Sequence, residues 1–176
     1  MAPELLGKVL SVEFDGVVAS GRIIETEAYT ADDPASHSFS GRTDRNAVMF
    51  GAAGRLYVYL SYGIHACANV VTGAQGEGAA VLLRAIDPIE GVVAMRARRG
   101  AARPLADGPG KLCQALGIAL GDDGIDLTTP GSRIRILDDG TPPPADPLAG
   151  RRIGITKGLD RPWRWRTAAR RDDQRP

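Results

Sequence analysis

The 176-residue chain is nearly neutral overall, with 22 Lys or Arg residues against 21 Asp or Glu residues and a net charge of +1. Its 43% hydrophobic content suits one globular domain with a buried core, and no apolar run approaches the roughly 20 residues of a membrane helix. Residues 151–176 nevertheless hold nine Lys or Arg against three acids, and residues 1–150 carry a net charge of −5. We therefore exclude a membrane protein and expect a basic C-terminal part that can attract a polyanion.

Strand patterns open the chain. Residues 7–14 and 17–29 are predicted strands joined by an Asp-Gly hairpin turn. Because residues two apart in a strand share a face, Glu25, Glu27 and Tyr29 should project together. Two carboxylates with no cation adjacent on that face predict that the face is either solvated or used chemically.

The middle of the chain is predicted to hold an irregular polar loop, 30–46, which carries His37. Three strands are predicted after it, at residues 55–62, 66–71 and 80–86. The last of them is interrupted by Arg84. A lone arginine in a buried strand is expected to point at a partner, because burying it unpaired is expensive.

Two helices are predicted next. Asp87 is the expected N-cap of the first, with Pro88 at its first position, and this helix should end near Arg99. The second should open at residues 107–111 and continue through 118. Its free N–H groups, together with Lys111, indicate a phosphate-binding position. Short strands are predicted beyond it, at residues 133–137, 153–156 and 163–166.

All four tyrosines and both histidines of the chain fall between residues 25 and 69. These side chains place a ring beside a polar group, which suits a pocket for a flat, partly polar ligand. A carboxylate beside such a ligand can activate water or stabilise a developing cation, as cleavage between a sugar and a base requires. Two histidines 28 positions apart predict no zinc site, and the two isolated cysteines, Cys67 and Cys113, are expected to be buried and reduced.

Five segments, in order along the chain, resemble the alkyladenine (3-methyladenine) DNA glycosylase family: GRIIETEAY, SHSFSGRTDRN, LYVYLSYGIHACANV, VLLRAIDPIEG and GPGKLCQALGI. The resemblance implies an α+β fold, a single compact domain of mixed α/β structure on a curved antiparallel β-sheet with flanking helices. We assign residues 1–166 to this domain and expect 167–176 to be a basic, disordered tail. A cytoplasmic location, of the bacterial cytosol or nucleoid type, is expected because no secretion signal is visible.

The resemblance also implies the activity. Family members act as monomers without a metal or cofactor, and they flip a damaged nucleotide out of double-stranded DNA. The implied reaction is hydrolysis of the N-glycosidic bond of alkylated purines such as 3-methyladenine and 7-methylguanine, with hypoxanthine and ethenoadenine as further candidates. It belongs to DNA base-excision repair.

Matching positions suggest residue roles. Glu27 resembles the general base that activates water, and Arg84 resembles the companion that positions this water. The resemblance assigns the walls of the substrate pocket to Tyr29, His37, Tyr59 and Asn69. It implies that Asn69 crowds the exocyclic amine of normal guanine. It assigns to DNA binding Tyr62, as the wedge that fills the gap in the duplex, and His65, Arg42 and Lys111.

Several alternatives stay open on the residues alone. Spacing does not separate Glu25 from Glu27. Tyr59 could be an ordinary strand residue, Tyr62 a turn residue packed on the core, and Asn69 a residue that bonds backbone. The chain also lacks the family's Gly-Asn/Ser-Pro segment after residue 166, which leaves a catalytically weak nucleic-acid-binding module as the alternative function. Hydrolysis of free nucleosides is a third reading.

Overall fold

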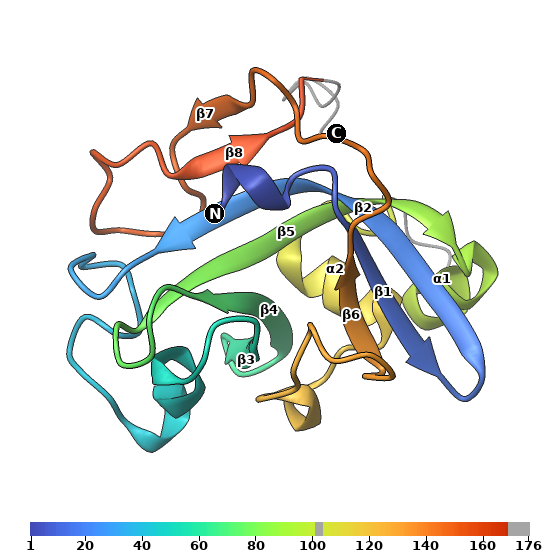
Figure 1. Cartoon of the computed structure of the whole chain (residues 1–176), viewed down its shortest axis with the longest axis horizontal. Coiled ribbons are helices and arrows are strands. Elements are labelled where there is room, and N and C mark those ends of the chain that lie inside the picture. Colours follow the sequence, from blue (N-terminus) through green and yellow to red (C-terminus); the bar gives the residue numbers. More distant parts are fainter. Residues whose placement is uncertain (101–103, 169–176) are drawn as a thin grey trace.

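A computed structural model describes residues 1–100 and 104–168 and builds them on a curled antiparallel sheet (Figure 1). Its main path runs β3-β4-β5-β2-β1-β6, and β8 pairs with β2 and with β7. The strands are β1 (Val9–Phe14), β2 (Val17–Tyr29), β3 (Leu56–Ser61), β4 (His65–Thr72), β5 (Ala79–Glu90), β6 (Ile134–Leu137), β7 (Leu148–Gly150) and β8 (Arg164–Arg166). The predicted α+β fold, a single domain on a curved antiparallel sheet, is confirmed.

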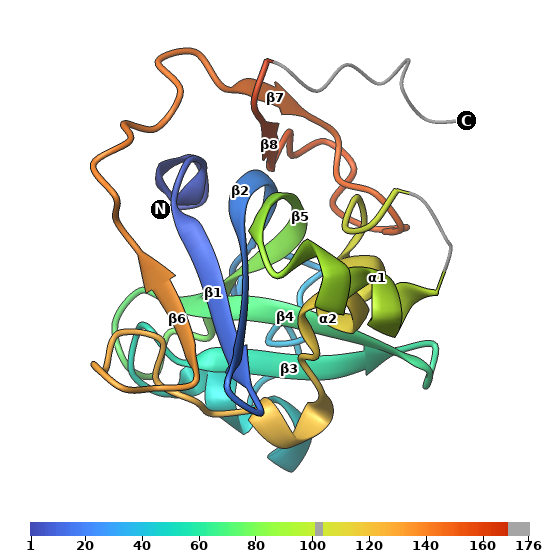
Figure 2. The same cartoon turned by 90° about the vertical axis from the view of Figure 1, so that its right-hand side faces the viewer.

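The helices are short, and two of them pack together against the sheet. Helices α1 (Val92–Arg99) and α2 (Pro109–Leu116) lie side by side in Figure 2, and α2 contacts β4 and β5. Leu112, Cys113 and Leu116 of α2 are fully buried in the main core. Three 3-10 helices complete the list: η1 (Pro3–Leu5), η2 (Asp44–Phe50) and η3 (Leu120–Asp122).

The two longest strands, β2 and β5, pair with each other at the centre of the sheet. Their register shifts on both sides of Glu25, which marks a β-bulge in β2. Bulges bend a strand and increase its twist, and they often redirect a side chain beside a functional site. Glu25 and Glu27 both lie in this bent part of the strand, where β8 also pairs with β2.

The predicted helix start at Asp87 is wrong. Asp87 and Pro88 continue β5, opposite Arg22 and Gly21 of β2, and the helix begins only at Val92. The reason lies at Gly91, whose φ is +69° and where a Cβ would stand 2.4 Å from the carbonyl oxygen of Val18. Only glycine fits this close turn between strand and helix. Because its backbone is left-handed, the right-handed helix begins after it.

The C-terminal third also differs from the prediction. Residues 153–156 form no strand, because their backbone bonds elsewhere: the Ile153 N–H donates to a carboxylate of β2. The short strand β7 has no counterpart in the prediction, and α2 ends at Leu116, where Gly117 takes up a left-handed conformation. The predicted tail, 167–176, lies outside the described residues from position 169 onward.

Two further observations concern the described residues. Cys67 and Cys113 are buried free thiols, as predicted. No helix in the described ranges is long and apolar enough to span a bilayer.

Candidate active site

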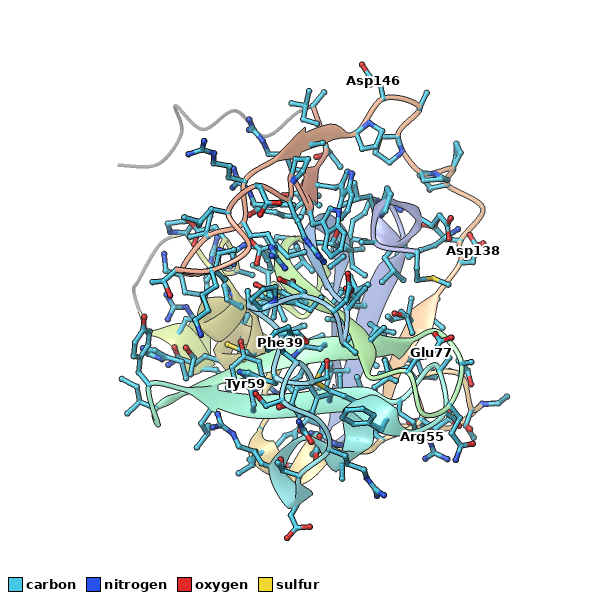
Figure 3. All side chains as sticks on the ribbon, turned by 90° about the vertical axis from the view of Figure 1, so that its left-hand side faces the viewer. Phe39, Arg55, Tyr59, Glu77, Asp138 and Asp146 are labelled. Atoms are coloured by element: carbon cyan, nitrogen blue, oxygen red, sulfur yellow. The ribbon has the colours of Figure 1, made fainter. Side chains whose placement is uncertain are left out.

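A cavity of about 420 Å³ is lined by residues of β2, β3, β4 and β5, of η2 and α2, and of the connecting loops, a size within the usual range of small-molecule sites. Its walls include the predicted substrate-binding residues Tyr29, His37, Tyr59 and Asn69 and the predicted catalytic residue Arg84. The loop that carries His37 passes beside Tyr59, and Figure 3 labels both Tyr59 and Phe39 of this loop. One wall of the cavity is therefore aromatic.

Three rings make up that wall. Tyr57 and Tyr59 lie two apart in β3, so they share a face, and their rings stack at a centroid distance of 5.7 Å. The His37 ring stands edge-on to Tyr59 at 4.4 Å, and its Nδ1 is 2.9 Å from the Tyr57 hydroxyl. Burial raises the pKa of Tyr57 to about 12, whereas burial and the nearby charge of Arg45 lower the pKa of His37. The wall is thus an uncharged aromatic surface at neutral pH.

Asn69 bonds backbone and lines the cavity at the same time. Its Nδ2 donates to the carbonyl oxygens of Tyr57, at 3.1 Å, and Cys67, at 3.4 Å. These bonds fix the amide between two strands. The alternative that Asn69 bonds backbone is confirmed, and it leaves the side chain in a fixed position at the pocket wall.

A buried acid–base cluster lies beneath the pocket. Arg84 of β5 donates from Nε to Glu25 Oε1 at 3.0 Å and from Nη1 to Glu27 Oε2 at 3.2 Å. The expectation that the two carboxylates lack an adjacent cation is therefore wrong, because the cation comes from the neighbouring strand rather than from β2 itself. The prediction that Arg84 points at a partner is confirmed.

Glu27 has no exposed surface and accepts three hydrogen bonds from residues of the pocket wall. Besides Arg84, the Tyr29 hydroxyl donates to Oε2 at 2.9 Å, and the Ile153 N–H donates to Oε1 at 2.8 Å. A carboxylate offers about four acceptor positions, and these hydrogen bonds occupy three of them. Burial raises the pKa of Glu27, against the opposing effects of Arg84 and of the Ile153 and Tyr29 hydrogen bonds.

Glu25 occupies a different environment. It shares Arg84 with Glu27 but is also bonded by Arg164 of β8, whose Nη1 lies 3.3 Å from Glu25 Oε1. Arg164 does not line the cavity, whereas all three donors to Glu27 do. The geometry therefore separates two carboxylates that spacing left equivalent: the donors to Glu27 all line the pocket, whereas Glu25 is also bonded by an arginine that does not.

The hairpin between β3 and β4 carries Tyr62 at the edge of the cavity. Its side chain is 90% exposed, and its φ of +51° is unusual for a bulky residue. The alternative that Tyr62 packs on the core is therefore wrong. A large ring held outward by a strained turn, beside a pocket, is suited to contact with another molecule.

The methylpurine-DNA glycosylase (MPG) family matches residues 1–171. The chain belongs to this family. Relatives named "Putative 3-methyladenine DNA glycosylase" include those of Burkholderia lata, 50% identical over 94% of this chain and 80% of the relative, and of Rhodopseudomonas palustris strain HaA2, 54% identical over 94% and 79%. A relative of the same name from Methanoculleus marisnigri is 48% identical over 94% of this chain and 87% of its own length. The chain is thus a DNA glycosylase, a hydrolase that acts on alkylation damage to DNA.

Of the predicted DNA-binding residues of this glycosylase, Tyr62 lines the pocket and the other three lie outside its lining. His65 begins β4 beside α2, where a Cβ on Gly110 would stand 3.0 Å from its own Cβ. Lys111 is exposed on α2 and pairs with Asp107 at 2.8 Å, so part of its charge is already neutralised. Arg42 is exposed in the loop after β2.

Sequence reasoning missed several residues of this glycosylase site. Arg45 and Met49 of η2 and the segment Ile153–Ile155 line the cavity. Arg45 follows Arg42 in a basic cluster that was visible in the sequence, whereas nothing in the RIGI segment indicates a pocket wall. In the part of the chain that the structure describes, no group of three or more His, Cys, Asp or Glu side chains is placed to hold a metal ion.

Proposed function

We propose that the protein hydrolyses the N-glycosidic bond of alkylated purines, 3-methyladenine and 7-methylguanine among them, after the nucleotide is flipped out of double-stranded DNA. The observation that carries this proposal is the position of Glu27, which is bonded to three residues that line the pocket. The family and the names of the relatives support the same substrate class.

In the proposed reaction Glu27 accepts a proton from a water molecule while the water oxygen bonds to C1′ of the sugar. The C1′–N9 bond breaks, and its electron pair passes to the purine. Arg84, which touches both the pocket and Glu27 Oε2, orients the water. No redox step and no covalent protein intermediate are needed to balance this hydrolysis.

Selectivity for alkylated purines follows from charge. Methylation at N3 or N7 makes the purine cationic, so it stacks favourably on the Tyr59 face and departs as a neutral base. His37, whose pKa is lowered by burial, is neutral and does not repel this cation. A neutral lesion such as hypoxanthine or ethenoadenine lacks both advantages, and we expect its release to be slower.

The proposed duplex contacts are Tyr62 at the pocket edge and three residues outside the pocket lining. Tyr62 would fill the gap that the flipped nucleotide leaves, and His65 stands on the same hairpin. Arg42 and Lys111 would contact phosphates on either side. We propose that one copy of the chain suffices, since the cavity and its donors all come from a single chain.

The pH dependence of excision tests the role of a buried base. Glu27 must be ionised to accept a proton, so activity is lost as pH falls through its pKa. Because burial raises that pKa, the acidic limb of the second-order rate constant should lie above the range of an ordinary glutamate, about 4.3. The residual excision by the variant Glu27→Gln should show no such acidic limb. A wild-type limb at or below the pKa of an ordinary glutamate would contradict the assignment of Glu27 as the base.

The salt dependence of binding tests the phosphate contacts. The logarithm of the binding constant should fall linearly with the logarithm of salt concentration, with a slope of about −0.9 per phosphate neutralised. Lys111→Ala and Arg42→Ala should each flatten the slope by about one such unit. Deleting 168–176, of which 169–176 lie outside the described residues, should flatten it further only if the basic tail replaces the family's missing segment.

Three substrates distinguish the proposed function from its alternatives. Methylated duplex DNA, methylated single-stranded DNA and free 7-methylguanosine are incubated with the protein, and released bases are measured. We expect fastest release from the duplex. Binding without release would identify a nucleic-acid-binding module, and release from the free nucleoside alone would identify a nucleoside hydrolase.

A further inference from the structure

Residues 151–158, which follow β7, bond Glu27 at Oε1, whereas Arg84 bonds it at Oε2, and we call these residues the cover segment. It forms neither strand nor helix. Its Ile153 N–H is the donor to Glu27 Oε1, and Ile153, Gly154 and Ile155 form part of the pocket wall. An irregular segment that holds such a hydrogen bond needs an anchor, because nothing in its own secondary structure fixes its backbone.

Arg152 anchors the cover segment. Its fully buried guanidinium forms a two-point ion pair with Asp33, with Nη2 3.0 Å from Oδ1 and Nη1 bonded to Oδ2. Nη1 also donates to the carbonyl oxygen of Ala28 at 2.9 Å, and Nη2 donates to that of Gly158 at 3.1 Å. A planar fork with several donors fixes geometry in a way that a single point charge does not.

The same guanidinium also contacts the pocket ring that bonds Glu27. Its central carbon stands 4.7 Å from the centroid of Tyr29, whose hydroxyl donates to Glu27 Oε2. Arg152 is therefore linked indirectly to both oxygens of the Glu27 carboxylate. Its sequence neighbour Ile153 bonds Oε1, and Tyr29, which it contacts, bonds Oε2. It makes no direct hydrogen bond to Glu27 itself among the described contacts.

Gly158 packs closely against the Arg152–Asp33 ion pair. A Cβ there would stand 2.6 Å from Asp33 Oδ1 and 2.9 Å from Arg152 Nη2, and its φ is +60°. Only glycine lets the far end of the cover segment approach the ion pair so closely. Both ends of the segment are thus tied to the same buried pair.

We propose that the Arg152–Asp33 clamp is a positioning device for Glu27: it holds the Ile153 N–H and the Tyr29 ring against the two oxygens of the carboxylate. The inference rests on the proposed function of Glu27 as the base. Arg152 acts through these two groups and does not touch the reacting atoms.

The test is Arg152→Lys, which keeps the charge and loses the fork. Single-turnover excision from methylated duplex should slow by about tenfold, since small displacements of a positioned group cost rate. Because Glu27 loses a donor that favours its ionised form, the acidic limb of the pH profile should move to higher pH. Affinity for the duplex should remain near wild type.

Arg161→Lys is the matched control. Arg152 and Arg161 both lie over the Trp163 ring, with central carbons 5.6 Å and 4.5 Å from its centroid, but Arg161 pairs with Asp32 at the surface. It should leave both rate and limb unchanged. A purely structural role for Arg152 would lower the amount of active protein equally at every pH, so an unshifted limb in Arg152→Lys overturns the proposal.

Gly158→Ala decides the matter if Arg152→Lys does not fold. This variant keeps both charges, and its added Cβ crowds the Arg152–Asp33 ion pair. The acidic limb of the pH profile should shift in the same direction as in Arg152→Lys, and an unshifted limb overturns the proposal. Glu27→Gln separates the two hypotheses. If that variant keeps wild-type activity, the proposed base is wrong, whereas an inactive Glu27→Gln with an unshifted Arg152→Lys refutes the clamp alone.

Discussion

Replacing Glu27 by glutamine should lower base excision by roughly 100- to 10,000-fold, the range attributed to general-base catalysis. The substitution keeps the shape of the side chain and an oxygen for the Tyr29 hydroxyl and Arg84, but it removes the basicity. Binding to damaged duplex should survive, because the side chain is fully buried behind the pocket wall. Single-turnover rates and equilibrium binding, measured on the same duplex, separate the two effects.

Glu25→Gln is the matched control. It is equally buried, lies two residues away and bonds the same arginine, so it tests whether any loss of charge in the cluster abolishes activity. We expect a much smaller decrease, because Glu25 is also bonded by Arg164, which does not line the cavity. A greater loss of activity in Glu25→Gln than in Glu27→Gln would reverse the assignment of the base.

Replacing Tyr62 by alanine should weaken capture of damaged duplex by roughly ten- to hundredfold. A flipped nucleotide leaves a void, and a ring that fills this void prevents the nucleotide from returning to the stack. Stacking a base on an aromatic ring is worth about 1–3 kcal/mol. Since the side chain is 90% exposed and its backbone is strained, the melting temperature should change little.

Two comparisons make this prediction specific. Tyr62→Phe keeps the ring and should retain capture of the duplex. Single-stranded substrate offers no gap to fill, so Tyr62→Ala should matter much less there. Equal losses on duplex and single strand, accompanied by a melting temperature many degrees lower, would show that the ring supports the fold rather than the DNA gap.

Local patterns in the sequence predicted most of the sheet. Strand patterns predicted β1 to β5, and the Asp-Gly turn predicted the first hairpin. Local signals failed at Asp87, where an N-cap and proline pattern typical of a helix lies in a strand. There the pairing with β2 outweighs the local preference, since Gly91 provides the turn into the helix.

The floor of the site could not be predicted because its contacts span the chain. Glu27 and Ile153 are 126 positions apart, and Asp33 and Arg152 are 119 apart. No periodicity or spacing links residues at such separations. The family resemblance brought the aromatic wall and the arginine together, but it did not reveal what holds the carboxylate in place.

The most direct measurement uses wild-type protein and a duplex with a single 7-methylguanine. We expect one free 7-methylguanine for each abasic site formed, on a strand that stays uncut until it is treated with alkali. Hydrolysis by an activated water releases one base for each abasic site and leaves the sugar–phosphate backbone intact, so the strand is not cut. A duplex that the protein binds but from which no base is released would contradict the account.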